Sequence, residues 1–265
     1  MISAISNSSV LSARFALGRN QNEQRGVMQR LSTGKKINSG KDDPAGLISS
    51  EQLASAIAAL QAETQSLRRA DSNATIVDGH TSQLSSMMSE LNGLVVAGAN
   101  QGGMSDAESE AYQLQIDSLV SSIQRQGGQA LSSLGDIELP DGGNADVEAM
   151  LNDAMASVAS LASGGANSLS SGNFEAAQVA IQSAISNVST SRGEIGAYQK
   201  NVIGPQLNSN RVAIENLVES KSRISDTDFA VETSNLSRLE VLMAANSKVL
   251  KIAQQESRRV LHLLA

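Results

Sequence analysis

The two ends of the chain carry the same hydrophobic pattern, in which seam positions recur alternately three and four residues apart. Side chains at this spacing fall on one stripe of a helix, as in the seam of a coiled coil. The N-terminal stripe is Val10, Ala13, Leu17, Asn20, Gln24, Val27 and Leu31. The C-terminal stripe is Leu236, Leu239, Met243, Asn246, Leu250, Ala253, Ser257, Val260 and Leu264. Neither helix can bury its stripe alone, so each needs a partner helix.

The spacing does not say which helix is the partner. One alternative is an intramolecular bundle, and the other is packing between subunits. The polar members of both stripes weaken the seam and can fix its register.

Between the ends, the pattern predicts three further long helices. A loop over Ser32–Pro44 precedes the first, whose periodicity runs from Leu53 to Val95 and stops at Gly98–Gly103. Ser105 and Glu108 form a capping box that opens the second, lined as far as about Arg125. The third begins near Phe174 and continues to Ile224, with Gly204-Pro205 expected to kink or interrupt it.

The segment between the second and third helices reads as small and irregular. Glycines at 127, 128 and 135 are expected to loosen the chain, and Asp136–Leu139 to form a short strand before a turn at 141–143. Residues 146–162 predict a short helix, and 163–172 a flexible loop. The whole pattern indicates an all-α protein, a long antiparallel helical rod with terminal coiled-coil helices and a small irregular or β tip. A helix of roughly 50 residues spans about 75 Å, which favours a fibre subunit over a globule.

Composition supports thin seams between helices. Aromatic residues are 2% of the chain, whereas hydrophobic residues overall are 40%. Leu, Ile, Val, Ala and Met suit helix-on-helix packing. The net charge of −7 and the pI of about 4.9 argue against binding to nucleic acid or to an anionic membrane. The absence of cysteine excludes disulfides and thiolate chemistry.

Targeting signals are not evident at the N-terminus. Residues 1–30 have no apolar core of a signal peptide, because Arg14, Arg19 and Arg25 interrupt them, and no run of about 18 apolar residues occurs. Taken alone, this pattern indicates a cytoplasmic protein.

The sequence offers little catalytic chemistry. Its two histidines, His80 and His262, are far apart and read as solvated helix residues, and no known nucleotide, hydrolase or metalloprotease motif occurs. Asp42-Asp43 before Pro44 is better read as helix-start chemistry than as a metal site, and Asp226 and Asp228 do not fit a calcium loop. We therefore expect no enzyme activity, no metal and no cofactor.

Four stretches resemble bacterial flagellin. They are Leu31–Gly46 (LSTGKKINSGKDDPAG), Arg223–Arg238 (RISDTDFAVETSNLSR) and the end from Arg258 (RRVLHLL); Arg192–Lys200 is similar too. The resemblance covers roughly residues 1–130 and 175–265, with motifs in the family's order at both ends. Its signature positions here are Ile37, Asn38, Asp42, Asp43, Arg223, Asp226 and Asp228.

The resemblance implies a structural subunit that polymerises into the flagellar filament. Residues 1–40 with 224–265 would form the inner coiled coil, 41–135 with 173–223 the rod, and 136–172 a short tip in place of large outer domains. It reverses the cytoplasmic interpretation, since flagellins leave through the flagellum's type III export channel without a cleaved signal. It implies as partners other copies of the chain, an export chaperone and filament cap and junction proteins, with no nucleic acid or membrane.

Departures from the family pattern suggest two further points. Lys36 and Pro44 keep open the alternative of a hook–filament junction protein, although the match at Arg223–Arg238 argues against it. A protease domain in the middle, known in some relatives, has no room. In the patch that a Toll-like receptor recognises on enteric flagellins, arginine is replaced by Asn92 and glutamate by Gly93, while Leu94 remains. Weak receptor activation is expected.

Overall fold

The computed structural model describes residues 2–99, 105–137, 139 and 143–264, and it is helical nearly throughout. The α-helices are α1 (Ile2–Thr33), α2 (Pro44–Ala99), α3 (Asp106–Leu134), α4 (Gly143–Ala159), α5 (Phe174–Tyr198), α6 (Gly204–Ser225) and α7 (Phe229–Leu264). A short 3-10 helix, η2 (Leu169–Ser171), precedes α5, and a π-helical turn, η3 (Gln199–Ile203), joins α5 to α6. The all-α class predicted from the sequence is confirmed.

The helices form two compact units. Unit 1 contains residues 1–59 and 214–265, and unit 2 contains residues 60–213. Two of the helices, α2 and α6, contribute to both units, because each passes a unit boundary within its length.

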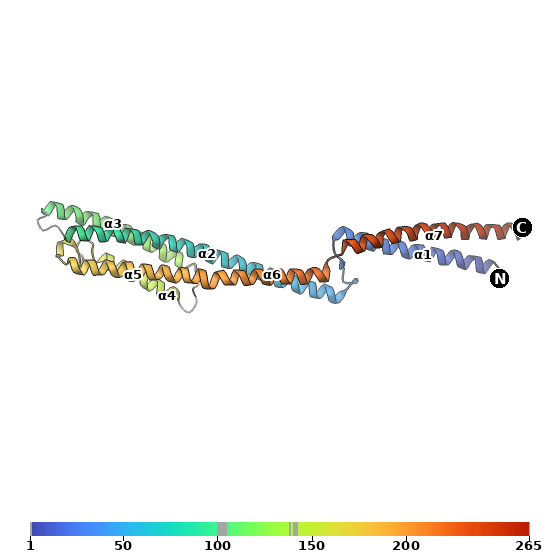
Figure 1. Cartoon of the computed structure of the whole chain (residues 1–265), viewed down its shortest axis with the longest axis horizontal. Coiled ribbons are helices and arrows are strands. Elements are labelled where there is room, and N and C mark those ends of the chain that lie inside the picture. Colours follow the sequence, from blue (N-terminus) through green and yellow to red (C-terminus); the bar gives the residue numbers. More distant parts are fainter. Residues whose placement is uncertain (1, 100–104, 138, 140–142, 265) are drawn as a thin grey trace. The chain divides into compact units, whose positions relative to one another are not determined.

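In unit 1, α1 and α7 lie side by side and run in opposite directions (Figure 1). The helix ends in this unit are set by side chains and backbone. After α1, Gly34 has φ +69° and its N–H donates to the Arg30 carbonyl at 2.9 Å, the left-handed termination that glycine adopts without strain. Asp228 caps the start of α7, accepting from the N–H groups of Ala230 at 2.9 Å and Val231 at 3.2 Å.

In unit 2, α2 runs antiparallel to the continuous stretch of α5, η3 and α6. Three polar contacts follow one another in opposite directions along the two segments. They are Arg192 Nε to Asp78 at 2.8 Å, Gln199 Nε2 to Asp71 at 2.9 Å, and Gln206 Nε2 to Glu63 at 3.1 Å. The predicted antiparallel pairing of long helices is therefore present within this unit.

The core of unit 2 is a line of aliphatic side chains from α2, α3, α4 and α5. Its largest fully buried members include Leu84, Met88, Ile116, Leu151 and Ile181. No aromatic ring is among the fully buried residues in the described part, and Tyr112, Phe174 and Tyr198 pack against the core only partly buried. The low aromatic content thus suits a thin helical core.

The prediction that glycines 127 and 128 loosen the chain is wrong, because α3 continues to Leu134. Gly127 is buried against Met155 of α4, and a Cβ at this position would collide with the Met155 side chain. Glycine here permits close approach of two helices, which outweighs its low helix propensity of about 1 kcal/mol relative to alanine. The capping box at Ser105 and Glu108 is present at the start of α3, as predicted.

The strand predicted for Asp136–Leu139 is not found in the described residues of that segment, where Asp136 lies in a turn and Ile137 and Leu139 are coil. Of the predicted turn at 141–143, residues 141 and 142 lie outside the described part, and Gly143 begins α4. Within the expected tip, 136–172, α4 buries Val147, Leu151, Ala154 and Val158 against α3 and α5. Much of this segment therefore packs into the core of unit 2.

The interruption predicted at Gly204-Pro205 takes the form of the π-helical turn η3. Proline lacks the N–H that an α-helix requires, and a π turn changes the hydrogen-bonding register before it. The Gly204 N–H donates to the Gln199 carbonyl, five residues back. The helix thus continues through the proline without a break.

Candidate assembly surface

The α1–α7 seam contains the stripes predicted from the sequence. Val27 and Leu239 are buried, and Asn20 is 7% exposed. Val10, Leu17 and Leu31 on α1, and Leu236, Met243, Leu250 and Ala253 on α7, are half-buried. The side chains of Val260 and Leu264 lie outside the described part. The first partner of each stripe is therefore the other end of the same chain.

One end of the seam is closed by a two-pronged ion pair. Arg30 Nε lies 2.9 Å from Glu232 Oε1, and Arg30 Nη2 lies 3.0 Å from Glu232 Oε2. The Glu232 side chain is only 14% exposed, so the pair is better shielded from water than an ordinary surface salt bridge. The bidentate geometry also fixes the orientation of the two side chains relative to each other, because both carboxylate oxygens of Glu232 accept hydrogen bonds from Arg30.

A short backbone clip joins the loop after α1 to the loop before α7. Lys36 N–H donates to the Ser225 carbonyl at 2.8 Å, and Thr227 N–H donates to the Gly34 carbonyl at 2.9 Å. Lys35 and Asp226 form an isolated antiparallel bridge. The clip ties together segments about 190 residues apart and lies close in sequence to the ion pair, so it fixes the register in which α1 meets α7.

The family-signature residues build the clip and its flanks. Ile37 is buried, and Asn38 Nδ2 donates to the Lys35 carbonyl at 2.8 Å. Asp42 accepts from the N–H groups of Asn38 and Ser39, and Asp43 accepts from the Gly46 N–H at 2.9 Å in the first turn of α2. The carbonyl of Arg223 accepts from Lys36 Nζ at 3.0 Å.

The acidic signature residues act as hydrogen-bond acceptors for the chain itself. A hydrogen bond from the Ser39 hydroxyl holds the pKa of Asp42 below its usual value, and one from the Ser222 hydroxyl does the same for the pKa of Asp226. Asp43 and Asp228 cap α2 and α7. Across the residues with described positions, no group of three or more His, Cys, Asp or Glu side chains could hold a metal ion.

A second apolar row lies on the outer side of α7, away from the seam. Val241 is 69% exposed, Val249 53% and Ile252 58%, with Ala245 exposed between them. On α1, Leu11 and Phe15 also point away from the seam, and Phe15 is 70% exposed. The heptad pattern of the seam gives no sign of this surface, although the spacing of 241, 245, 249 and 252 is itself a helix row.

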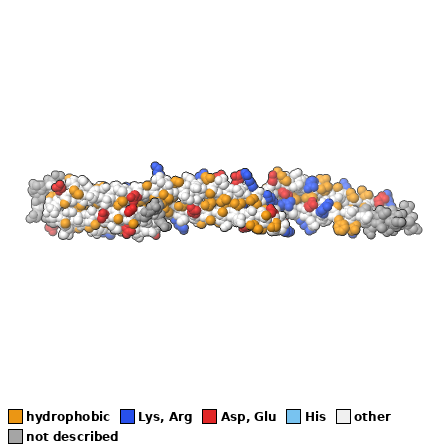
Figure 2. Space-filling view, turned by 90° about the horizontal axis from the view of Figure 1, so that it is seen from below, with side chains coloured by type: hydrophobic (Ala, Val, Ile, Leu, Met, Phe, Trp, Pro, Cys, Tyr) orange, Lys and Arg blue, Asp and Glu red, His pale blue; other side chains and the backbone are white. Residues whose placement is uncertain are grey.

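The charge of the chain is divided between the units. Unit 2 holds six Lys and Arg against sixteen Asp and Glu, a net charge of −10, whereas unit 1 holds fourteen against eleven, a net charge of +3. Figure 2 shows Lys and Arg side chains mainly over the part of the chain that contains α1 and α7. The net charge of −7 for the whole chain therefore reflects the acidic unit 2, and it hides the fact that unit 1 is basic.

The three residues of the altered receptor patch lie on α2 within unit 2. Gly93 is exposed, Asn92 is half-buried, and Leu94 packs partly buried against the core. The Asn92 Oδ1 atom is buried and finds no hydrogen-bond partner among the described residues. Gly93 is therefore the most exposed of the three.

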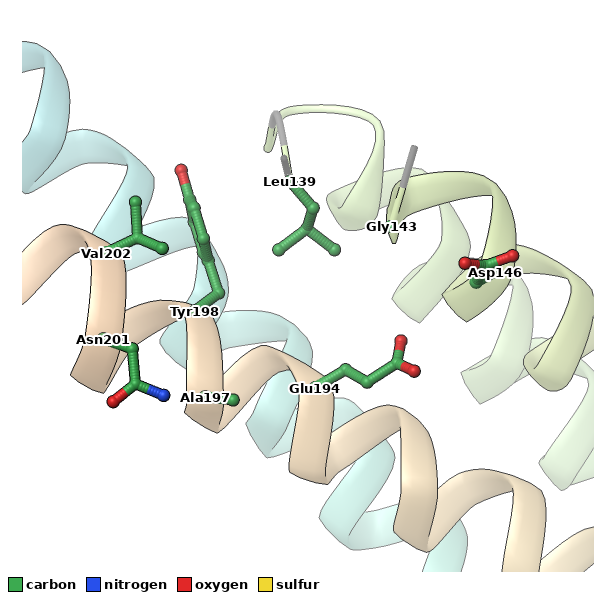
Figure 3. Close-up of a pocket in the computed structure, with 8 residues that line it drawn as sticks. All are labelled: Leu139, Gly143, Asp146, Glu194, Ala197, Tyr198, Asn201 and Val202. Atoms are coloured by element: carbon green, nitrogen blue, oxygen red, sulfur yellow. The ribbon is translucent and has the colours of Figure 1, made fainter. Parts of the chain in front are cut away.

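A shallow groove of about 360 Å³ lies in unit 2 between α4 and the α5–η3 junction (Figure 3). Leu139 and Tyr198 face each other across it, and the carboxylates of Asp146 and Glu194 lie farther along (Figure 3). Among the described residues that line the groove, none is a nucleophile paired with a base. His80 lies apart from it, with Nδ1 2.7 Å from Gln126 Nε2 on α3.

A chain whose two ends pair with each other and still expose an apolar row has the build of a self-assembling helical subunit. Two family models match it. The N-terminal helical region of bacterial flagellin matches residues 5–130, and the C-terminal helical region matches residues 179–264. The chain belongs to the bacterial flagellin family, whose members are structural proteins of the flagellar filament.

Individual relatives agree with the family match. A protein of Treponema maltophilum named flagellar filament 30.7 kDa core protein is 26% identical over 282 residues, covering 98% of this chain and 98% of the relative. A flagellin of Halalkalibacterium halodurans is 27% identical over 268 residues, covering 97% and 98%. A flagellin of Salmonella typhimurium is 38% identical over 84 residues, which are 32% of this chain and 17% of that protein.

Proposed function

We propose that the chain polymerises with copies of itself into the flagellar filament, and that unit 1 supplies the contacts between copies. The observation that carries this proposal is the exposed row on α7 beside a seam already filled from within the chain. An apolar row exposed on a helix marks a protein interaction site when it is contiguous. Family membership makes a second copy the natural partner.

The layers of the subunit follow from the same proposal. Residues 1–40 with 224–265 form the inner coiled coil, and 41–135 with 173–223 form the helical layer around it. Residues 136–172 replace the large outer domains, and their helix α4 packs within that helical layer. The small size of the middle segment is supported by the Treponema and Halalkalibacterium relatives, 98% of whose length is matched by this chain. In the Salmonella flagellin, by contrast, the match covers 17% of the length. The chain is thus of the short kind, without the large outer domains of enteric flagellins.

The location and partners of the chain are extensions of this proposal. The subunit is extracellular, leaves through the flagellar type III channel without a cleaved signal, and meets an export chaperone and the filament cap and junction proteins on its way. None of the helices within the described ranges is long and apolar enough to cross a membrane. Mass spectrometry of sheared filaments tests the route, since an N-terminal peptide beginning at residue 1 or 2 is expected.

The alternative, a hook–filament junction protein, is distinguished by abundance. A filament subunit is the dominant protein of sheared flagella, whereas a junction protein is a trace component. The match of the C-terminal flagellin model over residues 179–264 favours the filament subunit.

Two neighbouring substitutions test the assembly surface. Val249→Asp places a charge in the exposed row, and we expect a monomer of unchanged helicity that no longer sediments as polymer. Leu250→Asp places the same charge in the half-buried seam, and we expect loss of polymer together with loss of helicity in α1 and α7. Filaments of normal yield from Val249→Asp would show that the outer row is not a contact between copies.

A further inference from the structure

The outer sides of α1 and α7 in unit 1 are both apolar and exposed, but they differ in shape. On the outer side of α7, Ala245 stands one turn from Val241 and one turn from Val249, so the small side chain leaves a depression between two larger ones. On the outer side of α1, Phe15 projects with 70% of its surface exposed, and the next turn carries Gly18, which has no side chain. One surface offers a hole and the other a knob.

These two surfaces cannot meet within one copy. Phe15 and Ala245 lie on different helices of the pair, and each faces away from the seam that joins them. Both side chains therefore remain uncovered when α1 and α7 are fully paired.

We infer that Phe15 of one copy inserts over Ala245 of a second copy, between Val241 and Val249. This inference rests on the proposed polymerisation and deepens it by naming the two surfaces that meet. The contact is heterologous, because α1 of one subunit touches α7 of the next. Each subunit then keeps a free knob and a free hole, and a contact of this kind continues into an open helical polymer. A contact of like surfaces would close as a dimer and stop.

The absence of cysteine makes a direct test clean, because introduced thiols have no competitors. Gly18→Cys in one preparation and Val249→Cys in an epitope-tagged second preparation are copolymerised and treated with a short bis-maleimide. We expect the cross-linked dimer to contain one tagged and one untagged chain. Dimers formed only between two Gly18→Cys chains, or only between two Val249→Cys chains, overturn the inference.

Exchanging knob and hole provides the second test. The critical concentration for polymerisation, measured by sedimentation, is expected to rise about 10-fold or more for Phe15→Ala, which removes an anchor, and for Ala245→Phe, which fills the hole. The double variant restores an aromatic ring across the interface and is expected within about 3-fold of wild type. A double variant as poor as the worse single variant, or single variants equal to wild type, overturns the inference.

A matched control uses Met28, which is 49% exposed on another side of α1. Met28→Ala combined with Ala245→Phe is expected to show no rescue, and rescue by this pair counts against Phe15 as the knob. Circular dichroism of each monomer verifies that α1 and α7 are intact. If the wild-type chain itself fails to polymerise, the proposed function fails; if it polymerises and the variants behave otherwise than expected, only this contact fails.

Discussion

The substitution Leu250→Asp is the sharpest probe of the α1–α7 seam. Leu250 is half-buried on α7, and the antiparallel register that brings Leu239 beside Val27 places it level with Leu17. Burial of a whole leucine contributes about 1.5–3 kcal/mol, so a half-buried one contributes roughly 1 kcal/mol. An unpaired carboxylate in the seam adds about 2 kcal/mol or more.

The expected loss of about 3 kcal/mol is large for a pair of helices that bury one narrow seam. It shifts the folding equilibrium of the α1–α7 pair by roughly 150-fold, whereas Leu250 is not among the residues that form the core of unit 2. Limited proteolysis followed by mass spectrometry should therefore show rapid cleavage in α1 and α7 while residues of unit 2 stay protected. Leu31→Asp, on the facing stripe, should act alike, and both should abolish polymerisation. Normal filaments from either variant would refute the conclusion that the α1–α7 seam is needed for unit 1 to fold and for the chain to polymerise.

Four other outcomes are expected. In the wild-type monomer, protease should remove the ends first and leave a core of about residues 45–220; equal resistance of ends and core would contradict this. Asp117 accepts hydrogen bonds from Ser163 and Gln113; burial works to raise its pKa, but these bonds outweigh it and the pKa is lowered. The stabilisation is therefore complete above the ordinary pKa of about 3.9 and is lost as pH falls through the folded value, so Asp117→Asn should remove part of the acid dependence of thermal unfolding below about pH 4. Monomer should activate the Toll-like receptor weakly, because Asn92 lacks the fork of an arginine; in a reporter-cell assay Asn92→Arg should raise the response, and a wild type as potent as an enteric flagellin would refute this. Electron cryomicroscopy should show filaments with a thin outer surface, and a large outer domain on each subunit would rule that out.

The seam could be read from the sequence because its signal is periodic. Among the stripe residues with described side chains, Val27 and Leu239 are the most buried, and spacing alone predicts both positions. Spacing could not identify the partner helix, since a stripe looks the same whether it meets its own chain or another. The ion pair of Arg30 with Glu232 could not be predicted from the sequence either, because it joins residues 202 positions apart.

Other parts of the fold were misread where a local preference competes with packing. Gly127 signals a break by propensity, yet it is buried against Met155 inside α3. Ile137 and Leu139 alternate like a strand, but both are coil residues after α3 whose side chains are buried in the core of unit 2. The basic character of unit 1 was hidden because net charge sums over a chain whose units carry opposite signs.

The clip between residues 34–36 and 225–227 has a kinetic consequence. Closing a flexible loop of about 200 residues costs on the order of 5 kcal/mol in chain entropy, which α1 and α7 cannot recover quickly by themselves. Once α2 and the α5–α6 stretch have paired, the long intervening sequence no longer counts as flexible chain, and the two ends become near neighbours. Refolding should then proceed in order, with unit 2 first and the α1–α7 pair zipping outward from the clip toward the two termini.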